Sequence, residues 1–176
     1  MNRVLLVAEE RFPIARTFTI SRGSKTEAEV ITCTISADGH NGRGECVPYK
    51  RYGETLEGVR SEIEAISDAI TSGIGRNQLM GLMKPGAARN ALDCALWDLD
   101  AKQSGIRVAD RLGLKSPSAL ETAFTLSMST PEAMAMQARE NRMRPLLKVK
   151  IGGKGDMERI RAVRSAAPDS RLILDA

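Results

Sequence analysis

The last third of the chain alternates between strand-like and helix-like segments, and this alternation restricts the fold more than any other feature. Three short apolar segments, at residues 122–128, 146–151 and 171–175, are typical of buried strands. The segments that begin at Thr130 and at Asp156 have the starting residues and the apolar spacing of helices. Strands joined through single helices form a parallel sheet covered by helices. We therefore expect a β-α-β-α-β unit with a parallel sheet.

Three parallel strands do not close a barrel, so two interpretations of this unit remain open. It is either a small open α/β sheet or the first part of an eight-stranded barrel, which takes about 250 residues. An outer strand without a neighbour exposes an unpaired edge. A natural domain rarely ends one residue after a buried strand, and for this reason we favour the incomplete barrel.

The first part of the chain has the pattern of a small antiparallel sheet followed by helices. We expect strands at residues 2–9, 26–37 and 42–47. We expect helices at residues 55–73, 85–102 and 108–112. We expect loops at residues 18–25 and 48–54. Since residues 113–118 resemble a linker, we place one domain at residues 1–118 and a second, incomplete one at residues 119–176.

Two lysines lie on the second predicted strand of the β/α unit. Side chains alternate along a strand, so Lys148 and Lys150 point to the same face. Neighbouring ammonium groups repel each other, which makes a lysine easier to deprotonate and suits it to act as a base. The next strand ends on Asp175, at the same edge of the sheet. The sequence thus places two amines and one carboxylate close together.

Composition excludes several classes of protein. The net charge is only +4 and aromatic residues make up 3% of the chain, which argues against nucleic-acid binding. No apolar run reaches the roughly 18 residues that a membrane helix needs. Cys33, Cys46 and Cys94 are scattered and odd in number, so we expect reduced thiols and a cytoplasmic protein. A single histidine, His40, excludes a zinc site built from histidines.

Several segments in this order resemble a known family. They are Arg22–Ser24 with Glu27-Ala28, Gly44–Tyr49, Tyr52–Glu54, Gly86–Leu99, Leu147–Lys150 and Leu174–Ala176. The chain resembles the N-terminal half of an enolase-superfamily enzyme, and within that superfamily the dipeptide epimerases of the L-Ala-D/L-Glu type. The resemblance implies an α+β capping domain followed by the first β/α units of a TIM-like (β/α) barrel, truncated after three strands.

The resemblance also implies a role for individual residues. Lys150 matches one of two acid/base lysines that flank the substrate α-carbon, and Lys148 matches the lysine that tunes it. Asp175 matches the first of three Mg²⁺ ligands. Arg22 matches a residue of the capping domain that meets the acidic side chain of the dipeptide, and Thr125 matches a position that lines the site.

The function implied by the resemblance is Mg²⁺-dependent epimerisation of dipeptides through proton transfer at one carbon, with an enediolate intermediate. The substrate would be a small acidic dipeptide, for example from cell-wall peptides, and a homo-oligomer is left open. The alternatives are another reaction of the superfamily, such as a cycloisomerase or an o-succinylbenzoate-synthase-like reaction, and a non-catalytic half-barrel that only binds. The opposing lysine and the other metal ligands are not within these 176 residues, so we expect the fragment alone to be inactive.

Overall fold

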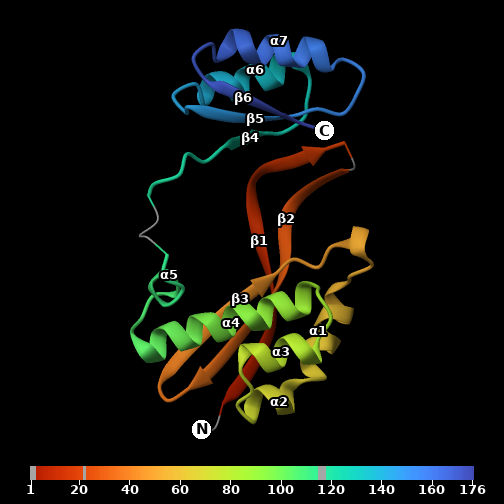
Figure 1. Ribbon diagram of the computed structural model, residues 1–176. Coiled ribbons are helices and arrows are strands. Elements are labelled where there is room, and N and C mark those ends of the chain that lie inside the picture. Colours follow the sequence, from red (N-terminus) through yellow and green to blue (C-terminus); the bar gives the residue numbers. More distant parts are fainter. Residues whose placement is uncertain (1–2, 22, 115–117) are drawn as a thin grey trace. The chain divides into compact units, whose positions relative to one another are not determined.

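The computed structural model describes residues 3–21, 23–114 and 118–176, which form two compact units (Figure 1). The first unit consists of residues 3–12 and 28–114. The second consists of residues 118–176 together with residues 13–21 and 23–27, a segment that we call the hairpin tip. Each unit has a three-stranded sheet and its own hydrophobic core. An α+β unit followed by β/α units is the predicted order.

The first sheet is formed by β1 (Val4–Ile20), β2 (Gly23–Ala37) and β3 (His40–Cys46), in that order. β2 and β3 pair antiparallel, from Ile31 opposite Cys46 to Ala37 opposite His40. The three strands are confirmed, but the predicted loop at residues 18–25 is wrong. β1 extends to Ile20 and β2 begins at Gly23, because pairing between neighbouring strands outweighs the local turn preference of the serines and glycine.

Helices follow β3 in the first unit. They are α1 (Leu56–Glu64), α2 (Ser67–Thr71), α3 (Arg76–Leu82), α4 (Ala87–Ser104) and α5 (Val108–Arg111), after a 3₁₀ turn at Lys50–Tyr52. The single helix predicted at residues 55–73 is instead two helices, and Ile63 of the first and Ile70 of the second are both fully buried. We did not predict α3, which buries only Leu79 and so lacks an apolar repeat.

The core of the first unit depends on a close approach between β3 and α4. A Cβ atom on Gly44 would lie 1.9 Å from the carbonyl oxygen of Ala91, and one on Gly42 would lie 2.2 Å from that of Ala95. Only glycine leaves enough room there, so the helix rests directly on the strand backbone. Ile31 and Ile35 of β2 are fully buried in the same core.

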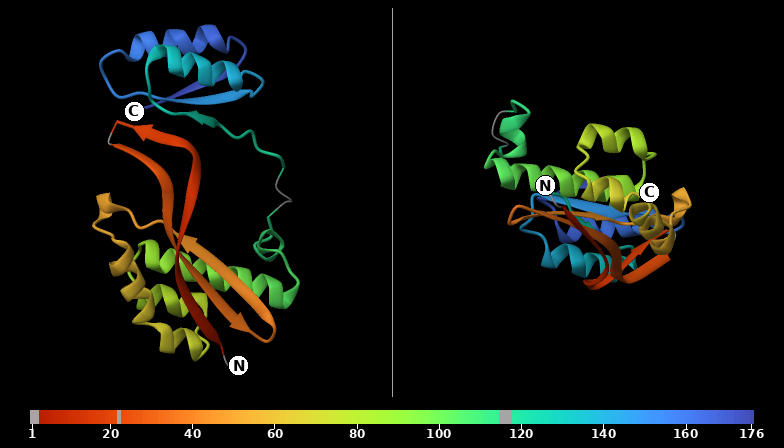
Figure 2. Two further views of the ribbon diagram at one scale, coloured as in Figure 1. Left: turned by 180° about the vertical axis from the view of Figure 1, so that it is seen from behind. Right: turned by 90° about the horizontal axis from the view of Figure 1, so that it is seen from below.

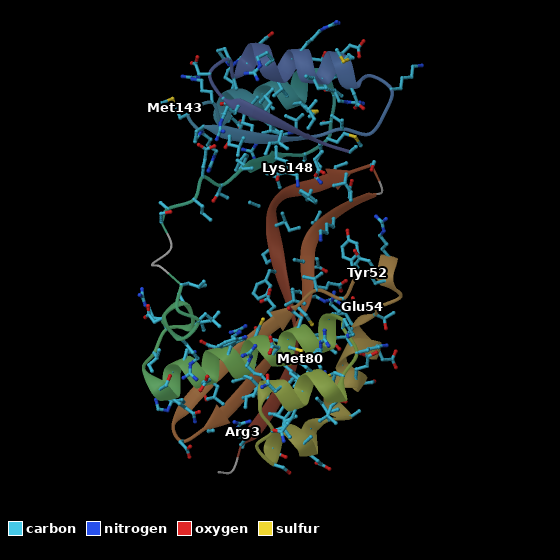
Figure 3. The ribbon with its side chains drawn as sticks, in the orientation of Figure 1. Arg3, Tyr52, Glu54, Met80, Met143 and Lys148 are labelled. Atoms are coloured by element: carbon cyan, nitrogen blue, oxygen red, sulfur yellow. The ribbon has the colours of Figure 1, made fainter. Side chains whose placement is uncertain are left out.

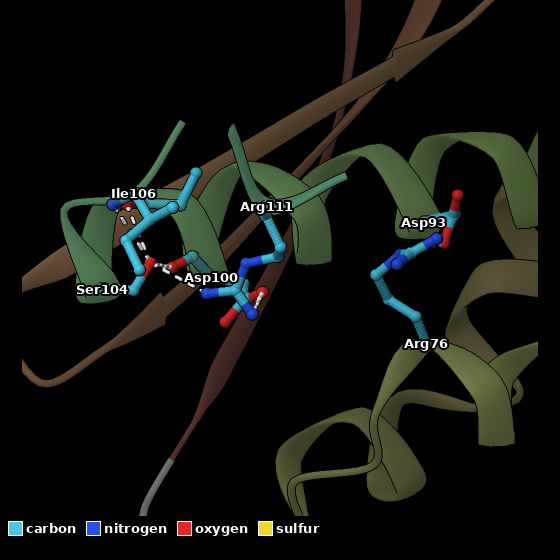
Figure 4. A network of polar contacts seen from close by, with 7 residues as sticks. Arg76, Asp93, Asp100, Ser104, Ile106 and Arg111 are labelled. Atoms are coloured by element: carbon cyan, nitrogen blue, oxygen red, sulfur yellow. Dashed lines mark hydrogen bonds and ion pairs between the residues drawn. The ribbon is translucent and has the colours of Figure 1, made fainter. Parts of the chain in front are cut away.

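Polar contacts hold α3 and α5 against α4 (Figure 4). Arg76 Nε of α3 donates to Asp93 Oδ1 at 2.9 Å, and its guanidinium lies 3.3 Å above the centre of the Trp97 ring. Arg111 of α5 pairs with Asp100 at 2.8 Å. These contacts therefore attach two short helices to the long one.

The second unit has the predicted β-α-β-α-β order. Its elements are β4 (Phe124–Leu126), α6 (Pro131–Glu140), β5 (Leu146–Lys150), α7 (Asp156–Ala166) and β6 (Arg171–Asp175). The strands pair in parallel in the order β4-β5-β6, and α6 and α7 cover the same face of the sheet (Figure 2). Thr130 caps α6 as expected, since its Oγ1 accepts from the amide of Ala133 at 3.3 Å.

One predicted cap in this unit is wrong. Gly155 occupies the N-cap position of α7, and Asp156 is its first residue. The Asp156 carboxylate instead accepts hydrogen bonds from the amides of Gly152 and Gly153 in the preceding loop. Within the described residues, no helix is both long and apolar enough to cross a membrane.

Candidate functional site

The sheet of the second unit has an apolar face and a polar face. Leu126 and Val149 are fully buried in the core beneath α6 and α7. Because side chains alternate along each strand, Lys148 and Lys150 lie on the opposite face, as predicted. Figure 3 shows Lys148 on the side of the sheet away from the two helices. The carboxyl-terminal parts of β5 and β6 thus carry the ionisable side chains Lys148, Lys150 and Asp175.

The register of the strands brings the predicted residues together. Thr125 of β4 is paired with Lys148 of β5, and Lys150 of β5 is paired with Asp175 of β6. Thr125 is half-buried. Paired residues of parallel neighbours point to the same face, so these four side chains share one surface. Arg22, the fifth predicted site residue, lies outside the described residues.

The Asp175 carboxylate lies between the two lysines. Lys148 Nζ is 2.9 Å from Asp175 Oδ2, and Lys150 Nζ donates a hydrogen bond to the same oxygen. Lys150 is the more buried of the two amines, with 19% of its side chain exposed against 37% for Lys148. Hydrogen bonds from Lys150 and Lys148 hold the pKa of Asp175 below its ordinary value. The ionised carboxylate therefore offsets the repulsion between the amines that the sequence alone suggests.

The hairpin tip lies against this part of the sheet. The Phe18 ring centre is 5.9 Å from Lys150 Nζ. The tip is held by hydrogen bonds from Met128 N to Thr19 O at 3.2 Å and from Ser127 Oγ to Thr17 O at 3.3 Å. Phe18 is a site neighbour that the sequence analysis missed; its only local signal is an aromatic residue in a segment that we expected to be a loop.

A second feature that the sequence did not indicate joins the loops beside the polar face. Arg159 of α7 donates to the carbonyl oxygen of Ser129 at 2.9 Å and to that of Lys154 at 2.9 Å, and it pairs with Asp156 at 3.0 Å. One guanidinium therefore connects the loop after β4 to the loop after β5.

Asp175 is the carboxylate that contacts both lysines of this face. They contain no group of three or more histidine, cysteine, aspartate or glutamate side chains that could hold a metal ion. Asp175 has the oxygen chemistry that Mg²⁺ prefers, and it fits the predicted role of one ligand among several. The near-octahedral coordination of Mg²⁺ needs further oxygen atoms from elsewhere.

Comparisons with known proteins identify relatives of this chain. The L-Ala-D/L-Glu epimerase of Escherichia coli (strain K12) is 41% identical to this chain over 176 residues, which cover 99% of the chain and 55% of the relative. The N-acetyl-D-glutamate racemase of a Pseudoalteromonas species is 38% identical over 149 residues, which cover 84% of the chain and 47% of the relative. The chain thus spans about half the length of these relatives.

Solved structures lead to the same group of proteins. An enolase family member from Agrobacterium tumefaciens with homology to dipeptide epimerases, bound to sodium and L-Ala-L-Glu, has a TM-score of 0.93 and 54% identity, covering 99% of this chain and 53% of its own. A dipeptide epimerase from Enterococcus faecalis, complexed with Mg and L-Leu-L-Tyr, has a TM-score of 0.87 and 29% identity, covering 100% of this chain and 54% of its own. The predicted fold class and superfamily are thereby confirmed.

The family itself follows from the first part of the chain. Residues 2–113 match the N-terminal domain of the mandelate racemase/muconate lactonizing enzyme family. The chain therefore belongs to that family within the enolase superfamily, and the dipeptide epimerases are its relatives.

Proposed function

We propose that the complete protein containing this chain epimerises dipeptides, with acidic dipeptides of the L-Ala-D/L-Glu type as substrates. The observation that carries the proposal is the convergence of Lys148, Lys150 and Asp175 on one face of a parallel sheet. The Escherichia coli relative and the Agrobacterium structure, named above for L-Ala-D/L-Glu and L-Ala-L-Glu, support the choice of substrate.

The chemistry we assign is the removal and return of the proton on the α-carbon next to a carboxylate. Lys150 takes the proton as the base, because it is the more buried amine and lies at the carboxyl end of its strand. Lys148 holds positive charge beside the negative charge that develops on the substrate carboxylate. Asp175 would be one ligand of Mg²⁺, which when bound supplies further positive charge for the enediolate. A lysine on the other side of the substrate would return the proton.

The experiment is proton exchange at the glutamate α-carbon of L-Ala-L-Glu in heavy water, followed by NMR with the complete protein. Lys150→Ala should slow the exchange by about 100-fold or more, the usual contribution of a general base. Lys154→Ala is a matched control, because Lys154 is exposed on the loop after β5, and it should exchange within about twofold of the wild type. Removal of divalent cations should stop the exchange, and added Mg²⁺ should restore it.

Two outcomes would contradict the proposal. Exchange at the wild-type rate in Lys150→Ala would exclude Lys150 as the base. A complete wild-type protein that binds acidic dipeptides without exchanging the α-proton would favour the non-catalytic alternative, and turnover of a different substrate class would favour another reaction of the superfamily.

We also propose the remaining roles and boundaries that the resemblance implies. Thr125 lines the substrate site, and Arg22 meets the acidic side chain of the dipeptide. Residues 1–118 form the capping domain and residues 119–176 the first three strands of the barrel domain. By these boundaries the hairpin tip would belong to the capping domain in sequence, although it is part of the second unit in the structure. We further propose a cytoplasmic protein, which cell fractionation can test.

A further inference from the structure

Gly152, in the loop after β5, has little room for a side chain on the side that faces Met128 and the hairpin tip. A Cβ atom there would lie 2.8 Å from Met128 Sδ and 3.2 Å from the Cβ atom of Ser21 in the hairpin tip. Gly152 is not among the glycines with positive φ, so space and not backbone conformation restricts the residue. The neighbouring Gly153 is the reverse case, with φ 118° and no atom within 4 Å of an added Cβ.

Met128 contacts both Gly152 and the hairpin tip. Its sulfur lies 2.8 Å from the position that a Cβ atom on Gly152 would take, while its backbone amide donates to Thr19 O at 3.2 Å. The preceding residue, Ser127, donates through Oγ to Thr17 O at 3.3 Å. The hairpin tip is therefore held by two hydrogen bonds, and its Ser21 lies close to Gly152.

The position of Phe18 follows from these contacts. Phe18 lies between Thr17 and Thr19, the two residues whose carbonyl oxygens accept the hydrogen bonds. Its ring faces Lys150 Nζ at 5.9 Å from the ring centre. A displacement of the hairpin tip by an ångström or so would move this ring relative to the amine, whereas Lys150 itself is held by the sheet.

We propose that Gly152 and Met128 form a seat that fixes the hairpin tip, and with it Phe18, over Lys150. Both are positioning residues, and their importance for the reaction rests on the function proposed above. The seat itself is a structural statement and can be tested without activity.

The first test is hydrogen exchange at the Met128 amide in the chain described here. Gly152→Val adds a branched side chain that must push back both the Met128 side chain and Ser21 of the hairpin tip, so this amide should exchange about tenfold faster or more. Gly81→Ala is the matched control, because an added Cβ there meets no atom within 4 Å, and it should leave the exchange unchanged. If Gly152→Val does not fold, the smaller Gly152→Ala takes its place, with a smaller acceleration expected.

The second test is rescue. Met128→Ala removes the sulfur that lies nearest to a Cβ atom at position 152. In the double variant with Gly152→Ala, the amide of residue 128 should therefore exchange more slowly than the sum of the two single effects predicts. Unchanged exchange of the Met128 amide in the Gly152 variants, or additive effects in the double variant, would overturn the proposal.

The third test separates the seat from the chemistry. In the complete protein, Gly152→Ala should raise KM for L-Ala-L-Glu by about tenfold and leave kcat within about threefold, because the tip moves while the amines stay. Equal loss of kcat and kcat/KM would overturn the positioning role. If the Met128 amide exchanges faster in the Gly152 variants but the complete wild-type protein does not act on L-Ala-L-Glu, the seat is supported and the proposed function is refuted.

Discussion

Gly44 of β3 offers a direct test of how the first unit is packed. The change is Gly44→Ala, which adds a single Cβ atom. That atom would lie 1.9 Å from Ala91 O, 2.7 Å from Ala95 N and 2.9 Å from Ala91 C. All three are backbone atoms of α4, so no side-chain rotation can relieve the contact. The helix must move away from the strand, or the strand must bend.

The expected cost follows from the tightness of this contact. Overpacking a well-packed core costs typically about 1–3 kcal/mol, and more where backbone must shift. Since the obstruction here is backbone on both sides, we expect the upper end, about 3 kcal/mol. With a denaturant slope of about 1.5 kcal/mol/M for a unit of this size, the urea midpoint should fall by about 2 M.

Trp97 makes this measurement specific to the first unit. It is the only tryptophan of the chain and lies on α4, and the Arg76 guanidinium is stacked on its ring at 3.3 Å from the ring centre. Its fluorescence during urea unfolding therefore reports on the helix that must move. The slope of the transition should stay the same, because the change alters stability and not the surface exposed on unfolding.

Gly81→Ala is the control for replacing a glycine without a steric clash. An alanine at this helical position should be neutral or should stabilise the unit by about 0.5–1 kcal/mol. A loss below about 0.5 kcal/mol for Gly44→Ala, or equal losses for both variants, would refute the claim that α4 rests on the β3 backbone.

Three further predictions concern the two units. Burial raises the pKa of the Cys33 thiol to about 12, so above a pH of about 9 the unfolded chain loses this proton while the folded unit keeps it. The stability of the folded unit should therefore fall as the pH rises from about 9. Urea midpoints that stay constant over this range would contradict the prediction. Glu54 accepts from Ala87 N at 2.7 Å and from Tyr49 N at 2.9 Å, so Glu54→Ala should cost about 1–3 kcal/mol in the same unfolding assay. Lys150 and Lys148 lower the pKa of Asp175, so the carboxylate should stay ionised and keep its two ion pairs at pH values where an ordinary aspartate takes up a proton. The ion pairs should be lost only at lower pH. A carbon-13 NMR titration that gives an ordinary aspartate pKa would contradict this prediction.

Much of the second unit could be predicted from local pattern. The alternation of apolar segments identified β5, β6 and their helices, because strand and helix periodicity are properties of neighbouring residues. The same alternation placed Lys148 and Lys150 on one face. The resemblance to a family, carried by short motifs, supplied the roles that periodicity cannot give.

The errors have a common physical origin. The break between α1 and α2 and the short α3 are not marked by the apolar spacing of these segments, so packing against the rest of the unit must decide them. The extended strands of the hairpin tip depend on pairing with a neighbour, which outweighs local turn signals. Local sequence cannot report either effect.

The sequence by itself determined the class of fold, the parallel β/α order of the second unit and the two amines that share one face. Only the tertiary structure decided that Asp175 contacts both amines and that Phe18, 132 positions before Lys150 in the sequence, lies beside one of them. The reason is that the spacing of apolar residues along a strand or helix reports only on residues that are close together in the sequence. Contacts between distant segments arise from strand register and from close packing, as at Gly152.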